Sequence, residues 1–203
     1  MYDSRKKGYR LFHKGLTKEI LIETAKEIMD ESGSAAFSMR ALAEKLGVKT
    51  ASLYTHIESM EALFTQVGLS ALNDQKEAQL SAIQGKSGDD AVFALAESYR
   101  AFAKAHAALY QLIMQMPMGQ DETLKAAAAM TAEPSMLVLQ AYPMPEERQM
   151  HWQRVLRGVM HGFVSQEAAG YFSHYPVEPD ESYHLAIQCV VDGLHREVSS
   201  DGR

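Results

Sequence analysis

The sequence predicts an all-α protein in which a small N-terminal unit of three helices precedes a larger C-terminal helical bundle. Apolar residues recur at helical spacing from Ile20 almost to the C-terminus, and no segment keeps the apolar–polar alternation that is typical of half-buried strands. A length of 203 residues suits one small module joined to one medium module. We therefore expect a first domain over 1–60 and a second over 61–203.

The first domain contains the start and stop signals of short helices. Thr17 is a suitable N-cap, and the residues that follow it keep helical spacing until Gly33 ends the helix. Ser38 caps a second, short helix, which ends at Gly47 in a left-handed turn. A third helix begins within four residues, and Ser59 caps a fourth. Two short helices joined by a tight turn that contains Gly are typical of a helix-turn-helix.

The second domain is divided into helices by a polar linker and by prolines. The linker is 84–90, at whose end Asp89 or Asp90 is expected to cap the next helix. Pro134 predicts a break, because proline lacks the backbone N–H that a helix interior uses. The expected helices cover 89–106, 107–116, 121–142 with this break, 146–171 and 180–198, the last with an apolar stripe of Leu185, Ile187, Val190, Val191 and Leu194.

Charge is unevenly distributed along the chain. The net charge of -6 disfavours a nucleic-acid binder when taken alone. However, residues 1–18 hold six basic residues and one acidic residue, whereas residues 61–203 hold ten basic and eighteen acidic residues. A polyanion is therefore attracted to the N-terminal end and repelled elsewhere. A solvated basic tail is the alternative that composition alone leaves open.

Several classes of protein are disfavoured. The chain has no apolar run long enough to span a membrane and no signal peptide in its first twenty residues, so we expect a cytoplasmic protein without a membrane partner. Cys189 is the only cysteine, and we expect a buried thiol. The eight histidines form no His-x-x-x-His pair, and no nucleophile elbow, phosphate loop or dinucleotide fingerprint is present. We therefore expect no metal, no cofactor and no enzymatic activity.

Two segments of the first domain carry a specific resemblance. They are Phe-Ser-Met-Arg-Ala-Leu-Ala-Glu-Lys-Leu-Gly-Val over 37–48 and Ala-Ser-Leu-Tyr-Thr-His-Ile over 51–57. With them, residues 17–72 closely resemble the TetR family of bacterial transcription regulators. This resemblance implies that a helix-turn-helix binds a double-stranded DNA operator and that a C-terminal helical domain dimerises and senses a small molecule. The tripeptide Met160-His161-Gly162 resembles a subgroup named for Trp-His-Gly, with Met160 in place of the Trp.

The third helix has the two faces that a recognition helix needs. Leu53 and Ile57 supply the buried face, and the opposite face offers donors, acceptors and a small Ala51 that can contact a thymine methyl. By resemblance, Tyr54 and His56 contact the phosphate backbone, although Tyr54 could instead be a core aromatic. The expected DNA-binding residues are Arg40, Lys49, Thr50, Ala51, Ser52, Tyr54, Thr55 and His56.

The fourth helix departs from the family pattern. Family members commonly carry a phosphate-contacting Lys at its second residue, where this chain has Met60, and Glu58 adds a negative charge nearby. Both changes weaken the electrostatic part of DNA binding, for which the basic arm could compensate. Met60 could alternatively be a core side chain.

The second domain is rich in methionine and aromatic residues, which adapt to irregular apolar shapes. We expect a pocket for a small apolar effector of unknown identity, although a filled core is the alternative for each side chain. The expected lining is Tyr99, Phe102, Tyr110, Met114, Trp152, Met160 and Phe163. Control by a protein partner, or by no ligand, stays open.

Gly158 and Gly162 lie on one face of a helix, where each costs up to about 1 kcal/mol relative to Ala. Close approach of another helix would offset that cost. By resemblance, the last two long helices form the interface of a homodimer. Its two DNA-binding domains, called heads below, would read a palindromic operator. Repression is the commoner outcome in the family, and we expect a repressor.

Overall fold

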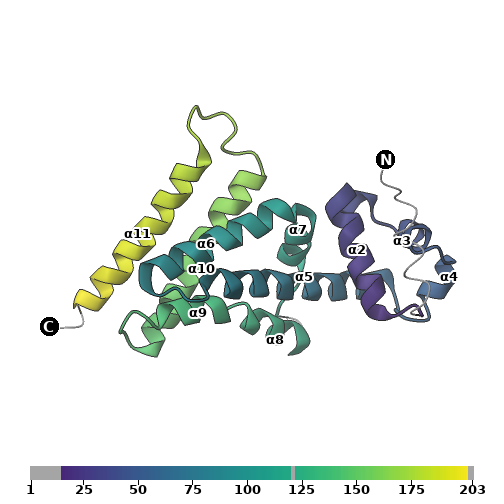
Figure 1. The fold of residues 1–203 in the computed structure, drawn as a ribbon, viewed down its shortest axis with the longest axis horizontal. Helices are drawn as coiled ribbons and strands as arrows, with labels where there is room; N and C mark the ends of the chain where they lie inside the picture. The colour runs from purple at the N-terminus through teal and green to yellow at the C-terminus, as the bar shows by residue number, and fades with distance from the viewer. Residues whose placement is uncertain (1–14, 120–121, 201–203) are drawn as a thin grey trace. The chain divides into compact units, whose positions relative to one another are not determined.

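The computed structural model describes residues 15–119 and 122–200, and every regular element in these ranges is a helix (Figure 1). The predicted all-α class is therefore confirmed. The backbone forms two compact units. The first contains the described residues up to Ala71 together with Ala108–Met116, and the second contains Leu72–Ala107 and the described residues from Pro117 onward. No helix within the described ranges combines the length and hydropathy needed to cross a membrane.

Three predicted hydroxyl caps begin helices of the first unit. Thr17 Oγ1 accepts a hydrogen bond from Ile20 N–H at 3.3 Å, and Ser38 Oγ accepts one from Ala41 N–H at 3.0 Å. Ser59 Oγ accepts a hydrogen bond from the N–H of residue 62 at 3.0 Å. The elements are α2 (Lys18–Ser32), the 3-10 turn η2 (Ser34–Ala36), α3 (Met39–Leu46), α4 (Thr50–Leu53), the start of α5 (Met60–Ile83), and α7 (Ala107–Gln115).

Gly47 makes the tight turn between α3 and α4. Its φ of 68° and ψ of 29° lie in the left-handed region, which a residue with a Cβ adopts at a cost. Beyond it, Val48 N–H donates to Ala43 O at 3.0 Å and closes the end of α3. The helix-turn-helix geometry therefore follows from local signals in the sequence.

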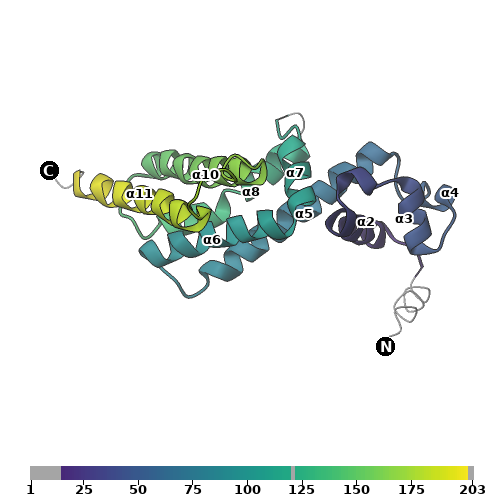
Figure 2. The ribbon, with the colours of Figure 1, turned by 90° about the horizontal axis from the view of Figure 1, so that it is seen from above.

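The second unit is a bundle around α10. Helix α10 packs against α11, α9 and α6, and α6 also contacts α9 and α11 (Figures 1 and 2). Pro134 lies in the first turn of α9, where its missing N–H breaks no helical bond. The elements are the rest of α5, α6 (Gly88–Ala105), α8 (Glu122–Met130), α9 (Glu133–Leu139), α10 (Glu146–Ala168) and α11 (Pro179–Ser200).

Three local expectations for this unit are wrong. Helix α6 begins one residue before Asp89, whose carboxylate instead accepts hydrogen bonds from the Tyr142 hydroxyl at 2.6 Å and from His195 Nε2 at 2.9 Å. Leu185 is 62% exposed, and Cys189 is exposed as well. The helical period explains both, since residues 185 and 189 lie one turn apart on the face opposite the buried Ile187.

Gly193 allows α10 and α11 to approach each other. A Cβ added to Gly193 would lie 2.4 Å from Cη2 of Trp152, a contact that real Cβ atoms do not make. By contrast, a Cβ at Gly158 or Gly162 would meet nothing within 4 Å in this chain. The close helix approach expected at those two glycines is therefore not made within one chain.

We expect Gly193→Ala to destabilise the protein by about 1–3 kcal/mol, because the overpacking outweighs the better helix propensity of alanine. Urea denaturation at fixed protein concentration measures this. The control is a double-mutant cycle with Trp152→Phe, which removes the clashing ring atoms. An equal loss for Gly193→Ala in both backgrounds would contradict the explanation.

A buried charge cluster joins α6, α10 and α11. Arg100 is 6% exposed and donates to both carboxylate oxygens of Glu167, at 2.8 and 2.6 Å, and to Asp180 at 2.7 Å. Its guanidinium carbon lies 5.0 Å from the ring centroid of Tyr183, whose hydroxyl donates to Ala96 O at 2.7 Å. The hydrogen bonds from Arg100 hold the pKa of Glu167 below its usual value.

Candidate DNA-reading surface and effector cavity

The segment around α4 has one buried and one exposed face. Leu53 is fully buried and Ile57 is 6% exposed, so these two side chains fix the segment to the first unit. Seven of the eight predicted DNA-binding residues are exposed, and Ser52 is half-buried. Helix α4 is shorter than expected, because residues 54–56 form the turn that follows it.

The exposed polar groups differ in how much hydrogen-bonding capacity they keep. Thr55 Oγ1 donates to Ser52 O at 2.7 Å, so its hydroxyl retains only acceptor capacity. Thr50, at the start of α4, has no side-chain partner among the described residues. Tyr54 is 50% exposed, which excludes the alternative of a core aromatic.

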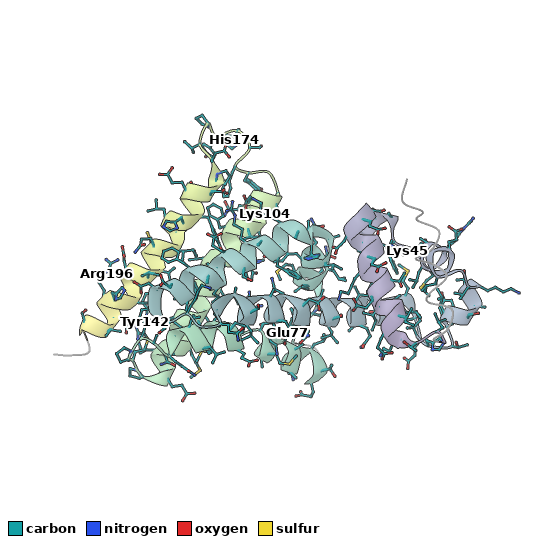
Figure 3. The ribbon with its side chains drawn as sticks, in the orientation of Figure 1. Lys45, Glu77, Lys104, Tyr142, His174 and Arg196 are labelled. Atoms are coloured by element: carbon teal, nitrogen blue, oxygen red, sulfur yellow. The ribbon has the colours of Figure 1, made fainter. Side chains whose placement is uncertain are left out.

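Most cations of the described first unit are paired with carboxylates. Arg40 donates to Glu44 at 2.9 Å, although its side chain is 85% exposed. Lys45, labelled in Figure 3, lies 2.9 Å from Glu31 and so joins α3 to α2. Lys49 forms no ion pair with any described residue. Lys49 is therefore the basic side chain beside α4 that needs no carboxylate to be displaced before it meets a phosphate.

Met60 begins α5 and is 41% exposed. The alternative that it is a core side chain is therefore wrong. A helix N-terminus presents unpaired N–H groups that attract phosphate, but here the thioether adds no charge. Of the basic arm, only Lys18 can be placed, and it is exposed. Arg5, Lys6, Lys7, Arg10 and Lys14 lie outside the described residues.

We expect Thr50→Ala to weaken discrimination at one operator position in each half-site by about 1–3 kcal/mol, because a hydroxyl that reads a base edge is lost. Thr55→Ala is the matched comparison and should have the smaller effect, because its hydroxyl proton is already donated to Ser52 O. Binding to operators with single base changes measures both. An equal loss on operator and random DNA would show that Thr50 does not read bases.

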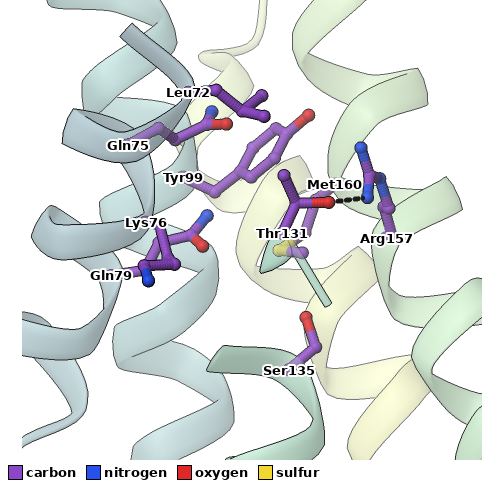
Figure 4. Close-up of a pocket in the computed structure, with 9 residues that line it drawn as sticks. All are labelled: Leu72, Gln75, Lys76, Gln79, Tyr99, Thr131, Ser135, Arg157 and Met160. Atoms are coloured by element: carbon purple, nitrogen blue, oxygen red, sulfur yellow. Dashed lines mark hydrogen bonds between the residues drawn. The ribbon is translucent and has the colours of Figure 1, made fainter. Parts of the chain in front are cut away.

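A small cavity lies inside the second unit (Figure 4). The space between its lining residues is about 330 Å³, including its opening to solvent. The centre of a water molecule can occupy only about 10 Å³ of that space. It therefore has room for about one water molecule, and a larger ligand must shift lining side chains. The lining is Leu72, Gln75, Lys76, Gln79, Tyr99, Thr131, Ser135, Arg157 and Met160.

The lining is more polar than the sequence indicated. Gln75 is 5% exposed and Gln79 is 6% exposed, and Figure 4 shows their amide groups directed from α5 toward Tyr99 and Met160. Across the cavity, Arg157 Nη1 donates to Thr131 Oγ1 at 2.5 Å. Only part of the wall is apolar, and the expectation of a methionine-rich pocket does not describe it.

The cavity contains two of the seven predicted ligand-binding residues, Tyr99 and Met160. Phe163 instead packs between Phe172 and Tyr183, with ring centroids 4.9 and 5.0 Å away. Trp152 contacts Gly193. Of the others, Phe102 is a buried core residue of the second unit, while Tyr110 and the 37% exposed Met114 belong to the first. Whether any of the five contacts a ligand stays a prediction.

Sequence reasoning missed the polar residues of the cavity. Gln75 and Gln79 continue the buried stripe that Leu72 occupies, one helical turn apart along α5. The sequence did contain a signal for a polar cavity: these polar residues occupy positions where helical spacing predicts apolar ones. Arg157 had no such signal, because its place depends on how α10 packs.

Comparisons with known proteins agree with this arrangement. Residues 21–67 match the family model described as bacterial regulatory proteins of the tetR family, and residues 92–190 match a tetracyclin repressor-like C-terminal domain. The two matches together cover both units. This chain belongs to the TetR family. It is a DNA-binding transcriptional regulator, and its likeness to the Trp-His-Gly subgroup stays a prediction.

Relatives of this TetR-family regulator cover nearly its whole length. An uncharacterised HTH-type transcriptional regulator of Mycobacterium tuberculosis is 29% identical over 92% of this chain and 85% of its own. A solved protein of unknown function from Rhodococcus sp. RHA1 shares the fold with a TM-score of 0.74 and 22% identity, over 90% of this chain and 97% of its own. A TetR variant of Acinetobacter baumannii solved in complex with minocycline gives a TM-score of 0.66 and 20% identity over 89% and 97% of the two chains.

The histidines and acidic residues within 15–119 and 122–200 form no metal-binding group. Among the described residues, no three His, Cys, Asp or Glu side chains lie close enough together to hold a metal ion. His195 is instead bonded to Asp89, and His161 lies 3.4 Å from Ser165 Oγ. The relatives are transcriptional regulators, which is a class without enzymatic chemistry.

Proposed function

We propose that this protein is a repressor that binds a palindromic operator as a homodimer and is released by a small molecule held in the cavity of the second unit. The observation that carries the proposal is that one chain has both an exposed polar face on 49–56 and a buried polar cavity in its second unit. The eight predicted residues from Arg40 to His56 would contact DNA. Residues 1–60 would serve DNA binding and 61–203 ligand binding and dimerisation, in the cytoplasm where the DNA lies.

Helix α5 is common to both activities. It begins at Met60 in the first unit and supplies Leu72, Gln75 and Gln79 to the cavity of the second. A ligand changes DNA affinity only as far as it binds one spacing of the two heads more tightly than another. The sequence predicts an apolar ligand, and the wall of Leu72, Tyr99 and Met160 supports an apolar part of that molecule. A protein with this fold was solved in complex with minocycline, which supports a small-molecule ligand for this chain.

Dimerisation is tested by light scattering, which should give the mass of two chains at micromolar concentration. Gly158→Leu should shift the protein toward monomer while each chain stays folded, because the added side chain meets nothing within its own chain but would collide with a partner helix. Ala78→Leu, which adds a leucine at an exposed position of α5, is the control. A wild-type monomer would contradict the proposal.

Palindrome reading is tested on an operator selected from random DNA. Inserting about five base pairs between the half-sites rotates one of them by about half a helical turn, so binding of both heads should be lost. Inserting about ten restores the facing and should restore much of the affinity. Equal binding to all three spacings would contradict a dimer that reads two half-sites.

A further inference from the structure

The cavity contains one cation that no carboxylate neutralises. Lys76 Nζ lies 3.4 Å from Glu133 Oε2 and 3.9 Å from Glu77 Oε1, so these two carboxylates offset its positive charge. Arg157 donates to the neutral hydroxyl of Thr131 and forms no ion pair with any described residue. A half-buried guanidinium beside a cavity therefore offers donors to an anion that the chain itself does not supply.

Gln75 adds a donor without an acceptor. Its side chain is 5% exposed, and its Nε2 is the only fully buried side-chain nitrogen or oxygen of the described residues that lacks a hydrogen-bond partner. An unsatisfied buried donor costs free energy, so such groups are rare and indicate a missing acceptor. The amide lies on the wall of the same cavity as Arg157 (Figure 4).

Hydroxyl and apolar groups complete the site. Ser135, which is 4% exposed, and Thr131 contribute hydroxyls from the junction of α8 and α9. Leu72, Tyr99 and Met160 supply the apolar wall. The site thus combines one unpaired positive charge, an amide donor and an apolar surface, which together suit a molecule with one negative charge and an apolar body.

We propose that the effector is a small organic carboxylate whose carboxylate accepts hydrogen bonds from Arg157 and from Gln75 Nε2, while its apolar part packs on Leu72, Tyr99 and Met160. This inference rests on the proposed function, because it names the chemical class of the molecule in that cavity. A carboxylate fits better than a phosphate ester, since one unpaired guanidinium matches a single negative charge and a planar carboxylate matches its fork.

The positive charge of Arg157 acts on His161, which lies one turn further along α10. Burial, and then the positive charge of Arg157, lower the pKa of His161. A carboxylate bound at Arg157 would offset that charge, so the pKa of His161 should rise when the site fills. Titration of the His161 ring by NMR, with and without ligand, therefore reports where the anion binds and does not depend on DNA.

The test compares benzoate with benzamide, which have nearly the same planar shape and differ in charge. Calorimetry with the full-length protein should show that benzoate binds at least about tenfold more tightly, because its hydrogen bonds are charge-assisted. Arg157→Met should reduce this ratio to near one. Arg154→Met, the same change at an exposed position of α10, should leave it unchanged.

Gln75→Leu provides a second variant. Replacing an unsatisfied amide by an apolar side chain of similar size should raise the melting temperature of the free protein and weaken benzoate binding. A residue that only stabilised the fold would lower the melting temperature when replaced. This opposite pair of changes keeps the proposal testable even if Arg157→Met fails to fold.

Each outcome bears on the proposal. Equal affinities for the two probes, tighter binding of phenyl phosphate than of benzoate, or binding of neither probe at millimolar concentration would overturn a carboxylate site. Operator release is measured separately with the same probes. If both probes release the operator equally, the inference of a carboxylate site fails, while the proposed release of the operator by a ligand still holds. If benzoate binds through Arg157 without releasing the operator, the carboxylate site stands and the proposed release by ligand fails.

Discussion

Replacing Arg100 by methionine is expected to lower the free energy of unfolding by about 3–5 kcal/mol, because it removes the buried, bidentate partner of Glu167. The arginine also binds Asp180 and lies over the ring of Tyr183, so the variant loosens three helices together. Urea denaturation at fixed protein concentration measures the loss, since the stability of an oligomer depends on concentration.

Lys104→Met is the matched control. Its ammonium lies 3.4 Å from the same carboxylate oxygen of Glu167, but the side chain is 57% exposed. Such exposed pairs contribute about 0–1 kcal/mol, so the control should lose little. Equal losses for the two variants would contradict the view that burial makes the Arg100 cluster important.

The effect of Arg100→Met should depend on pH. In the wild type, hydrogen bonds from Arg100 lower the pKa of Glu167, so the ion pair stabilises the protein above the pKa of an unfolded glutamate. That contribution is lost as the pH falls through the lowered pKa of the folded state. In the variant, Glu167 keeps only the exposed Lys104 as a neighbouring cation, so burial is opposed less and its pKa should lie higher than in the wild type. The difference between the two proteins should therefore shrink as the solution is acidified.

Met60→Lys is expected to tighten operator binding and to steepen its salt dependence. The side chain is exposed at the first residue of α5, where the helix N-terminus already attracts a phosphate. Each new phosphate contact releases about 0.9 of a counterion, so a dimer should gain about two units of slope in log affinity against log salt. Specificity should hardly change, because phosphate contacts position a protein without reading bases.

Two further variants complete this experiment. Lys49→Met should reduce the slope by a similar amount, because Lys49 forms no ion pair among the described residues. Met150→Lys places a lysine at an exposed methionine of the second unit and should leave the slope unchanged. Thermal melts should show Met60→Lys as stable as the wild type. An unchanged slope for Met60→Lys, with unchanged stability, would mean that this end of α5 does not face DNA.

Features that depend on nearby residues could be predicted from the sequence. The caps at Thr17, Ser38 and Ser59 and the left-handed turn at Gly47 each need a partner within four residues, so the sequence contains the whole signal. The two faces of the α4 segment follow in the same way from the spacing of Leu53 and Ile57.

Features that depend on tertiary packing could not be predicted. The grouping of α7 with the first unit and the presence of Arg157 and Gln75 in one cavity each bring together residues far apart in sequence. The exposure of Leu185 and Cys189 was not predicted, because hydrophobic character alone does not tell which side of α11 packs against the rest of the unit. Methionines suggested an apolar pocket, yet Met114, Met130 and Met150 are exposed.

Selection of bound sequences from random DNA tests whether this protein reads a specific operator. The wild-type protein should enrich an inverted repeat and bind it at least about 10³-fold more tightly than scrambled DNA at physiological salt. Thr50→Ala should narrow that ratio and Met60→Lys should leave it nearly unchanged. Enrichment of no sequence, or equal affinity for the selected and scrambled DNA, would contradict a regulator that reads an operator through the exposed face of residues 49–56.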